Sequence, residues 1–252
     1  FRYVAPVEST DSGDIFNYGI IDGSGQLDDG AVLIVYQEAR AADTPAAVEA
    51  GTTVDYYALE TPQSLPDFDA LEPYLSEVVP NINYPSTNGD FAGSGLSNDF
   101  GCVFRGFIEV PDSGWYTLYT NSDDGSALYI GDEQVVENDG LHGMRERSGT
   151  IALQAGRHAV RVEFFERGGG AGCIVSIEGG GLGKQVVPDA MWSHEVQLPG
   201  DTNGDGMIDV LDLLQVILDW GVCPADGDCL GDLDGNGVVD VEDLLLVIGA
   251  WT

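Results

Sequence analysis

Basic residues are scarce in this chain of 252 residues. Nine Lys and Arg residues stand against 43 Asp and Glu residues, which gives a formal net charge of −34. Such a surface repels nucleic acids and anionic membranes, and it attracts divalent cations. Long apolar runs are also missing, because the longest ones, residues 31–36 and 244–248, are far too short to cross a bilayer. We therefore expect neither nucleic-acid binding nor membrane insertion.

Signatures of catalysis are missing from the sequence as well. The three histidines are His142, His158 and His194, and there is no G-x-S-x-G element, H-E-x-x-H helix or phosphate-binding loop. Carboxylates are so numerous that no pair stands out as an acid–base couple. We expect a protein that is not an enzyme.

Cysteine occurs four times, an even number that suits an oxidising compartment. Cys223 and Cys229 bracket a short loop and are predicted to form a local disulfide, which leaves Cys102 and Cys173 as a long-range pair. Neither pair has the C-x-x-C spacing of a thiolate metal site. The sequence starts at Phe1 and shows no signal peptide, so we predict a mature secreted chain whose leader has been removed, located outside the cell or at its surface.

The composition divides the chain into three regions, residues 1–50, 51–198 and 199–252. The first region contains one clear strand candidate, residues 31–36, after turn-rich segments. Fifty residues without cysteine bury too little surface to form a stable independent domain easily. We expect this segment to pack on the following domain or to be exchanged with a neighbouring molecule.

The middle region is predicted to be mainly β. Short runs rich in β-branched and aromatic residues recur between turn signals, and several alternate apolar and polar residues, as half-buried strands do. The predicted strands are residues 103–110, 115–120, 127–130, 150–153, 158–166 and 172–177. Many short strands with Gly-rich turns favour a sandwich or a barrel. One short helix is expected at residues 67–78.

The last region contains a twelve-residue loop that occurs twice, 31 positions apart. Each copy, DTNGDGMIDVLD and DLDGNGVVDVED, precedes an apolar helix candidate. A calcium ion takes six to eight oxygen ligands, and an EF-hand loop supplies them at positions 1, 3, 5, 7, 9 and 12. In the first copy these are Asp201, Asn203, Asp205, the Met207 carbonyl, Asp209 and Asp212. In the second copy they are Asp232, Asp234, Asn236, the Val238 carbonyl, Asp240 and Asp243.

The alternative to two calcium sites is a pair of acidic surface turns. Two matching copies, each ahead of an apolar helix, favour calcium. From Pro199 onward there are twelve acidic residues and no Lys or Arg. Without metal this segment should repel itself, so we expect it to bind two calcium ions and to fold only with them.

This repeat resembles type I dockerin modules, because position 12 is Asp instead of Glu and the duplication is tight. The resemblance covers residues 200–252 and implies a small all-α double EF-loop module that docks onto a cohesin domain of an extracellular assembly. The sequence departs from the dockerin pattern at the disulfide candidate and at positions 10 and 11, which hold Val210, Leu211, Val241 and Glu242. The partner is therefore left open between a cohesin-like domain and another copy of this chain.

The middle region resembles the protective-antigen-type domain of anthrax protective antigen and yeast flocculins. The motifs that carry the resemblance include FRGFI, GWYTL, NSDDGSALYI and VEFFE, in the family's order between Gly51 and Trp192. The resemblance implies a β-sandwich. The overall prediction is thus a mainly β protein, a protective-antigen-type β-sandwich with a small C-terminal all-α dockerin-like module.

In sugar-binding members of that family, an Asp–Asp pair holds a calcium ion that coordinates sugar hydroxyls. Asp123 and Asp124 match this pair and would hold a third calcium ion, with Asn138 or Asp139 contributing from the next loop. The alternative is that the pair only organises a turn between strands.

Two non-enzymatic functions are consistent with these features. The sequence favours a structural subunit of an extracellular assembly, such as a fibre, filament or surface layer, held together by the dockerin-like module and the N-terminal strand segment. The alternative is a calcium-dependent carbohydrate-binding or adhesion module that its dockerin anchors to a cohesin scaffold. In the first case the partner is another copy of this chain, and in the second it is a cohesin-like domain, with glycans as ligands.

Overall fold

The computed structural model describes residues 13–21, 27–35, 39–196, 198–204, 206–224 and 229–251. The chain divides into two units, Phe1–Arg40 and Ala41–Thr252. The first unit therefore ends before residue 50, and the residues that follow Arg40 belong to the second unit.

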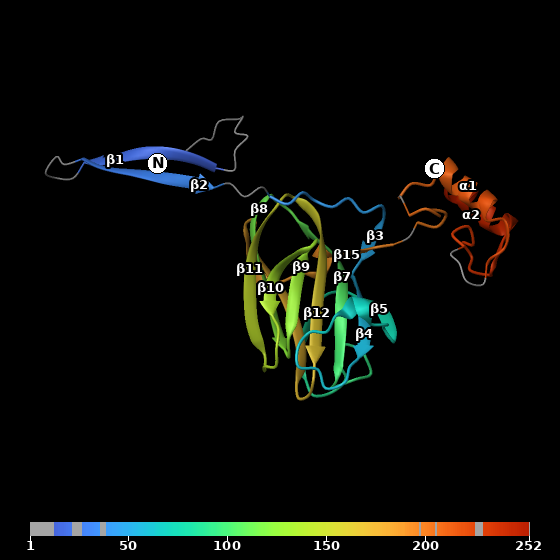
Figure 1. Cartoon of the computed structure of the whole chain (residues 1–252), viewed down its shortest axis with the longest axis horizontal. Coiled ribbons are helices and arrows are strands. Elements are labelled where there is room, and N and C mark those ends of the chain that lie inside the picture. Colours follow the sequence, from blue (N-terminus) through green and yellow to red (C-terminus); the bar gives the residue numbers. More distant parts are fainter. Residues whose placement is uncertain are drawn as a thin grey trace. The chain divides into compact units, whose positions relative to one another are not determined.

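In the first unit, β1 (Gly13–Ile21) and β2 (Leu27–Val35) form an antiparallel hairpin that is paired along its whole length (Figure 1). The strand predicted at residues 31–36 is confirmed as far as Val35, and Tyr36 lies outside the described residues. The packing of this hairpin on another domain or molecule stays a prediction.

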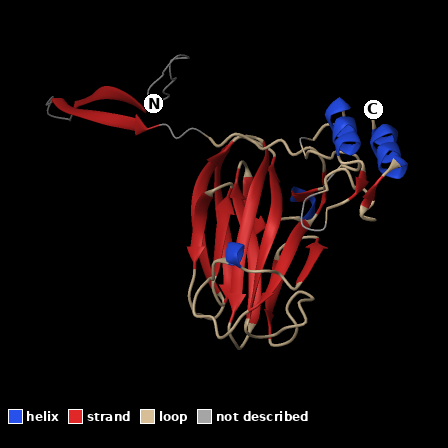
Figure 2. Cartoon of the chain, turned by 45° about the vertical axis from the view of Figure 1, so that its right-hand side comes forward, coloured by secondary structure: helices blue, strands red, loops and turns tan. Residues whose placement is uncertain are grey.

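The second unit contains two antiparallel sheets that form a β-sandwich (Figure 2). The larger sheet has eight strands in the order β10-β9-β12-β7-β15-β3, and β4 pairs with both β7 and β5. Its strands are β3 (Val48–Ala50), β4 (Thr52–Ala58), β5 (Leu75–Val79), β7 (Phe100–Val110), β9 (Ser126–Ile130), β10 (Glu133–Asn138), β12 (Gly156–Glu166) and β15 (Trp192–Glu195). The predicted β-sandwich is confirmed.

The smaller sheet has five strands in the order β11-β8-β13-β14, and β6 also pairs with β13. These strands are β6 (Asn83–Thr87), β8 (Gly114–Asp123), β11 (Arg145–Leu153), β13 (Ala171–Gly179) and β14 (Leu182–Val186). All six strands that the sequence predicts for the middle region lie within elements of the two sheets. The alternation of apolar and polar residues identified them because each strand has one face in the core.

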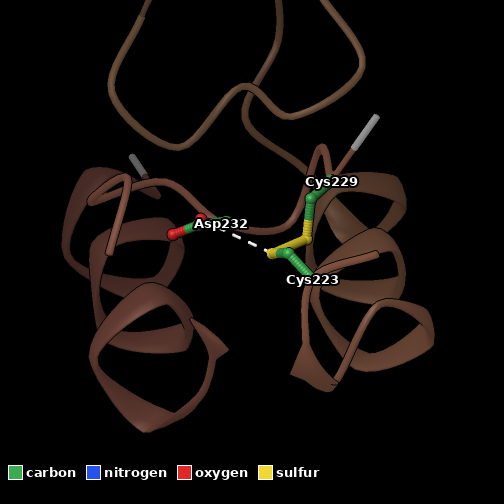
Figure 3. A group of neighbouring side chains, drawn as sticks. All are labelled: Cys223, Cys229 and Asp232. Atoms are coloured by element: carbon green, nitrogen blue, oxygen red, sulfur yellow. Dashed lines mark hydrogen bonds between the residues drawn. A yellow bond between two sulfur atoms is a disulfide. The ribbon is translucent and has the colours of Figure 1, made fainter. Parts of the chain in front are cut away.

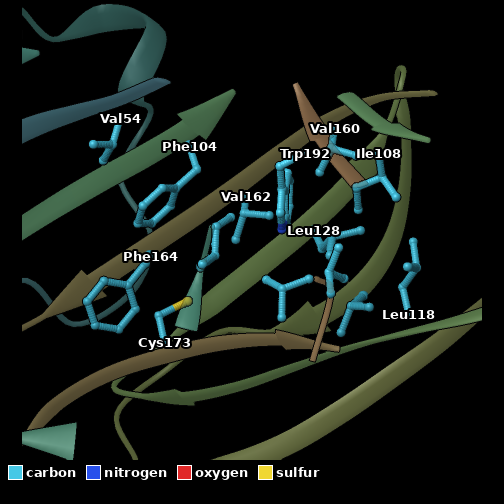
Figure 4. Close-up of a cluster of buried hydrophobic side chains, with 14 of the residues drawn as sticks. Val54, Phe104, Ile108, Leu118, Leu128, Val160, Val162, Phe164, Cys173 and Trp192 are labelled. Atoms are coloured by element: carbon cyan, nitrogen blue, oxygen red, sulfur yellow. The ribbon is translucent and has the colours of Figure 1, made fainter. Parts of the chain in front are cut away.

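The core lies between the two sheets. On β8, buried and half-exposed residues alternate. Phe104 and Phe164 from the larger sheet lie in the same buried cluster as Leu118 and Cys173 from the smaller one (Figure 4). Each large apolar side chain buried in this way stabilises the fold by about 1.5–3 kcal/mol.

The two core cysteines correct one prediction. Cys102 on β7 and Cys173 on β13 are fully buried free thiols, so the predicted long-range disulfide is wrong. Both pack as small apolar side chains, and burial raises their pKa values, that of Cys173 to about 12, which disfavours the thiolate needed for oxidation. The predicted disulfide between Cys223 and Cys229 is confirmed.

The helix predicted at residues 67–78 is also wrong. A single 3-10 turn, Phe68–Ala70, is followed by strand β5. Pro73 lacks the N–H group that a helix interior requires. Pairing of β5 with β4 supplies the backbone hydrogen bonds instead.

The C-terminal region contains two short helices, α1 (Val210–Leu218) and α2 (Val241–Ala250), and a two-residue ladder between β16 (Gly221–Val222) and β17 (Val238–Val239). Each helix begins with a capping box in which two aspartates satisfy the first backbone N–H groups. A small core of Val216, Val239 and Val247 joins the helices to the second loop. In the part of the chain that the structure describes, no helix is long and apolar enough to cross a membrane.

Candidate functional site

Three carboxylates meet at one end of the sandwich. Strand β8 ends at Asp123, and the peptide bond that joins it to Asp124 is cis. Strand β12 ends nearby at Glu166, because β12 pairs with β9, which begins just after Asp124. One carboxylate oxygen from each of the three residues lies within 4.8 Å of the others.

Glu166 is the residue of this cluster that the sequence analysis missed. It is fully buried, and neither of its carboxylate oxygens has a hydrogen-bond partner of regular geometry among the described residues. Burial, followed by the charges of Asp124 and Asp123, raises its pKa to about 8, and the nearby backbone N–H groups of Asp124 and Gly168 oppose this rise. The signal was present in the alternation of β12, where Glu166 continues the inward-facing positions of Val162 and Phe164.

The two aspartates differ in their surroundings. Burial and the charge of Asp124 raise the pKa of Asp123, while His142 and a hydrogen bond from Ser86 oppose the rise. The Asp124 carboxylate accepts hydrogen bonds from the backbone N–H groups of His142, at 2.8 Å, and Arg167, at 3.1 Å. These bonds fix one aspartate in position, whereas Glu166 beside it has no hydrogen-bond partner of regular geometry among the described residues. A hard cation would neutralise such a group of carboxylates.

Asn138 and Asp139 serve the adjoining loop. The Asn138 amide is buried, donates to the Ser122 hydroxyl and to the Arg145 carbonyl, and accepts from the Arg145 guanidinium at 2.8 Å. Asp139 accepts from the backbone N–H groups of Leu65 and Gly140. Both side chains thus bond to neighbouring protein groups, and the carboxylate that the structure adds to Asp123 and Asp124 is Glu166. A contribution of Asn138 or Asp139 to an ion site stays a prediction.

In the C-terminal region, the two repeated loops share one hydrogen-bond pattern. At position 1, Asp201 accepts from the N–H of Gly206 at position 6, and Asp232 accepts from that of Gly237, each at 2.8 Å. In each loop, this hydrogen bond holds the backbone at position 6 close to the position-1 carboxylate. Asp205 lies outside the described residues.

At position 12, Asp212 and Asp243 are fully buried. Each accepts N–H groups from the start of its loop and from position 9. Burial alone would raise their pKa values, but these hydrogen bonds outweigh it and lower both. Both side chains are therefore held in the ionised form that a cation requires.

The remaining predicted ligands are placed as follows. In the second loop, carboxylate oxygens of Asp232, Asp234 and Asp243 lie within 4.8 Å of one another, as a cation site requires. At position 9, Asp209 and Asp240 accept from N–H groups at the starts of α1 and α2. Asn236 bonds within the loop to Asp234 and to the Val238 N–H. Asn203 donates its N–H to Asp212, and Met207 is exposed. These oxygen donors fit a calcium ion.

The disulfide lies directly beside the second loop (Figure 3). The Cys223 sulfur is 3.5 Å from Oδ2 of Asp232. The Cys223 N–H donates to the Gly237 carbonyl, and the Asp232 N–H donates to the Cys229 carbonyl. Because the two sulfurs are bonded to each other, they offer no thiolate to a metal. The disulfide and these backbone hydrogen bonds instead restrain the conformation of the second loop.

A β-sandwich with a carboxylate cluster at one end is therefore followed by an acidic double-loop module. Residues 51–179 match the PA14 domain, and the chain belongs to that family. This finding confirms the resemblance to protective-antigen-type domains, and it assigns no family to the C-terminal module.

Solved structures share the fold. The chain is 21% identical to the PA14 domain of the MpAFP antifreeze protein, with a TM-score of 0.53, and the match covers 64% of this chain and 99% of that one. It is 22% identical to a domain described as the PA14 sugar-binding domain from RTX adhesin, with a TM-score of 0.51 and coverages of 57% and 98%.

An anti-sigma factor domain-containing protein is 19% identical, with a TM-score of 0.52, and the match covers 59% of this chain but only 48% of that one. This chain thus spans about half the length of that relative. A comparison with curated proteins gives no match.

Proposed function

We propose that this chain is a non-enzymatic, extracellular, calcium-dependent carbohydrate-binding module that carries its own calcium-stabilised attachment module. The observation that carries the first part is the buried Glu166 carboxylate, without a regular hydrogen-bond partner among the described residues, next to Asp123 and Asp124. An anionic side chain in such a place is costly unless a cation pairs with it.

Calcium suits this site because it binds carboxylate oxygens and takes six to eight ligands. Three carboxylates leave part of that coordination sphere open at the loop end of the sandwich. Neutral sugars carry adjacent hydroxyl groups that can fill such positions. The similar domain from the RTX adhesin is described as sugar-binding, which supports the same kind of ligand here.

The C-terminal module supplies the attachment in this proposal. Its two loops hold one calcium ion each through the predicted residues, and the ions offset part of the negative charge that opposes its folding. The resemblance to dockerins makes a cohesin-like domain the expected partner. Secretion and the absence of catalysis belong to the same proposal.

Self-assembly is the second candidate function, and the surface of the C-terminal helices favours it. Leu218 on α1 is 77% exposed, Val222 after it is 82% exposed, and Trp220, Leu245 and Trp251 are about half exposed. Exposed apolar side chains of this size in so short a region favour a contact with a partner. In this version the partner is another copy of the chain, and the hairpin β1–β2 provides further contacts.

The first experiment is a glycan array probed with the full chain in calcium and in chelator, beside calcium calorimetry. Asp124→Asn should lose array binding and one calcium ion, whereas Asp132→Asn, on the exposed turn between β9 and β10, should behave as wild type. Calcium binding at the cluster with no array signal would reject carbohydrate binding. Light scattering of the same samples tests self-assembly, since a monomer under both conditions rejects it.

A further inference from the structure

A cavity of about 320 Å³ lies on the outer face of the larger sheet. On β7, Phe104 and Ile108 belong to the core, so Arg105 and Phe107, which alternate with them, face outward. The partner of β7 changes along its length, because β4 pairs with it as far as Arg105 and β15 pairs with it at Phe107 and Ile108. Gly106 lies at this change of partner and lines the cavity.

Small and apolar residues form the floor of the cavity. Ala159 on β12 pairs directly with Phe107, and Gly131 donates its N–H to the Ala159 carbonyl at 2.8 Å. Because neither Ala159 nor Gly131 has a long side chain, the surface of the sheet is hollow next to Phe107. A hollow of this kind suits a methyl group or the apolar face of a small ring.

Arg161 on β12 supplies a hydrogen-bond donor at one side of this floor. Its two terminal nitrogens bond to Asp69 at 3.1 Å each, and one of them also contacts Glu163 at 2.7 Å. Its Nε is buried and has no hydrogen-bond partner of regular geometry among the described residues. Arg105 beside it is paired with Asp55 at 2.6 Å. Three carboxylates thus offset the two guanidinium charges, so the free donor suits a neutral acceptor better than an anion.

His194 and Glu195 lie on the other side of the cavity, because β7 separates β12 from β15 in the sheet. His194 is only 7% exposed, and its buried Nδ1 has no hydrogen-bond partner among the described residues. A buried polar atom of this kind requires a partner. Glu195 is exposed, and its carboxylate accepts hydrogen bonds. A ligand with an N–H group can therefore bond on this side.

We propose that this cavity binds the acetamido group of an N-acetylated sugar. The amide carbonyl accepts from Arg161 Nε, the amide N–H points towards β15, and the methyl group lies against Ala159. None of Asp123, Asp124 and Glu166 lines the cavity. Binding here therefore needs no calcium, and the site goes beyond the function proposed above.

Size and charge favour this ligand over others that carry an amide. A volume of about 320 Å³ is at the lower end for small-molecule sites, so it suits one sugar unit better than an extended peptide. The N-acetylated sugar carries no charge, so the net charge of −34 does not repel it.

Calorimetry of the full chain in chelator tests this site. The probes are the methyl glycosides of N-acetylglucosamine and N-acetylgalactosamine, with those of glucose and galactose for comparison. Wild type should bind the N-acetylated pair at least about tenfold more tightly, because the other two lack the amide and the methyl group.

Two variants and a matched control locate the binding. Ala159→Leu fills the hollow and should lose at least about tenfold in affinity for the N-acetylated glycosides. His194→Phe keeps a ring of similar size, removes the buried nitrogen and should lose roughly 3- to 10-fold. Ser148→Leu, at an exposed position of β11 in the smaller sheet, should match wild type. Thermal unfolding establishes that each variant is folded.

Several results would overturn the proposal. Wild-type affinity in both Ala159→Leu and His194→Phe would place the binding elsewhere. Equal affinity for all four glycosides would reject recognition of the acetamido group, and binding of none would reject the site. Binding of N-acetylalanine methylamide without the glycosides would assign the cavity to a peptide instead. The glycan-array signal that depends on calcium and Asp124 is measured separately, so this site and the proposed function can fail independently.

Discussion

Replacing Glu166 by Gln should stabilise the calcium-free protein at neutral pH. The carboxyl is fully buried, and burial together with Asp124 and Asp123 raises its pKa from 4.5 to about 8. Between these values the folded state holds a proton that the unfolded state has lost, so the stability of the fold decreases as pH rises through this window. Gln is neutral throughout and avoids the cost.

The size of this effect follows from the width of the pH window. Each pKa unit corresponds to about 1.36 kcal/mol, so at pH 7 the Glu166 carboxyl destabilises the fold by about 3 kcal/mol. At pH 5 the cost is less than about 1 kcal/mol. For a domain of this size the larger value corresponds to a rise in Tm of roughly 6–12 °C for Glu166→Gln.

Thermal unfolding in chelator at pH 5 and pH 7 measures this difference. Glu137→Gln on β10 is the control, because that side chain is exposed and its replacement should change Tm little. In calcium, wild type should instead be more stable than Glu166→Gln, since the variant has lost an anionic group beside Asp123 and Asp124. A variant no more stable than wild type in chelator at pH 7 would refute the description of Glu166 as an uncompensated buried carboxylate.

Further substitutions and the reduction of one disulfide test the calcium sites. Asp201→Ala and Asp232→Ala should each remove one calcium ion in calorimetry, because each carboxylate holds position 1 of its loop; an unchanged stoichiometry would contradict the assignment. Reduction of the Cys223 disulfide should weaken calcium at the second loop roughly tenfold, as loss of a supporting contact does. The Asp232→Ala variant, which keeps only the first loop's calcium site, serves to measure the effect of reduction on that loop. An equal loss of calcium affinity there would reject this local role. Arg145→Met should weaken calcium at the Asp123 cluster about 10- to 100-fold while the sandwich stays folded, since Arg145 holds the loop that carries His142. Wild-type affinity in that variant would contradict this role, and Arg147→Met on the same strand is its control.

Local patterns were enough to predict much of this molecule. The strands of the sandwich follow from alternation of apolar and polar residues, because each strand exposes one face to the core. The two acidic loops can also be recognised in the sequence, since all the ligands of an EF-hand-type calcium site lie within twelve consecutive residues. The disulfide between Cys223 and Cys229 is predictable for the same reason, because its partners are only six positions apart in the sequence.

Contacts between distant strands decided the rest. Glu166 reaches Asp123 and Asp124 only because β12 pairs with β9 and both ends meet there. The same packing ties Asn138 to Arg145 and leaves Cys102 and Cys173 as separate thiols in the core. The sequence by itself determined which segments form strands and where the two repeated acidic loops lie, because those properties depend on neighbours along the chain. Only the tertiary structure decided which carboxylates share a site, because that depends on strand pairing and on which side chains burial leaves without a partner.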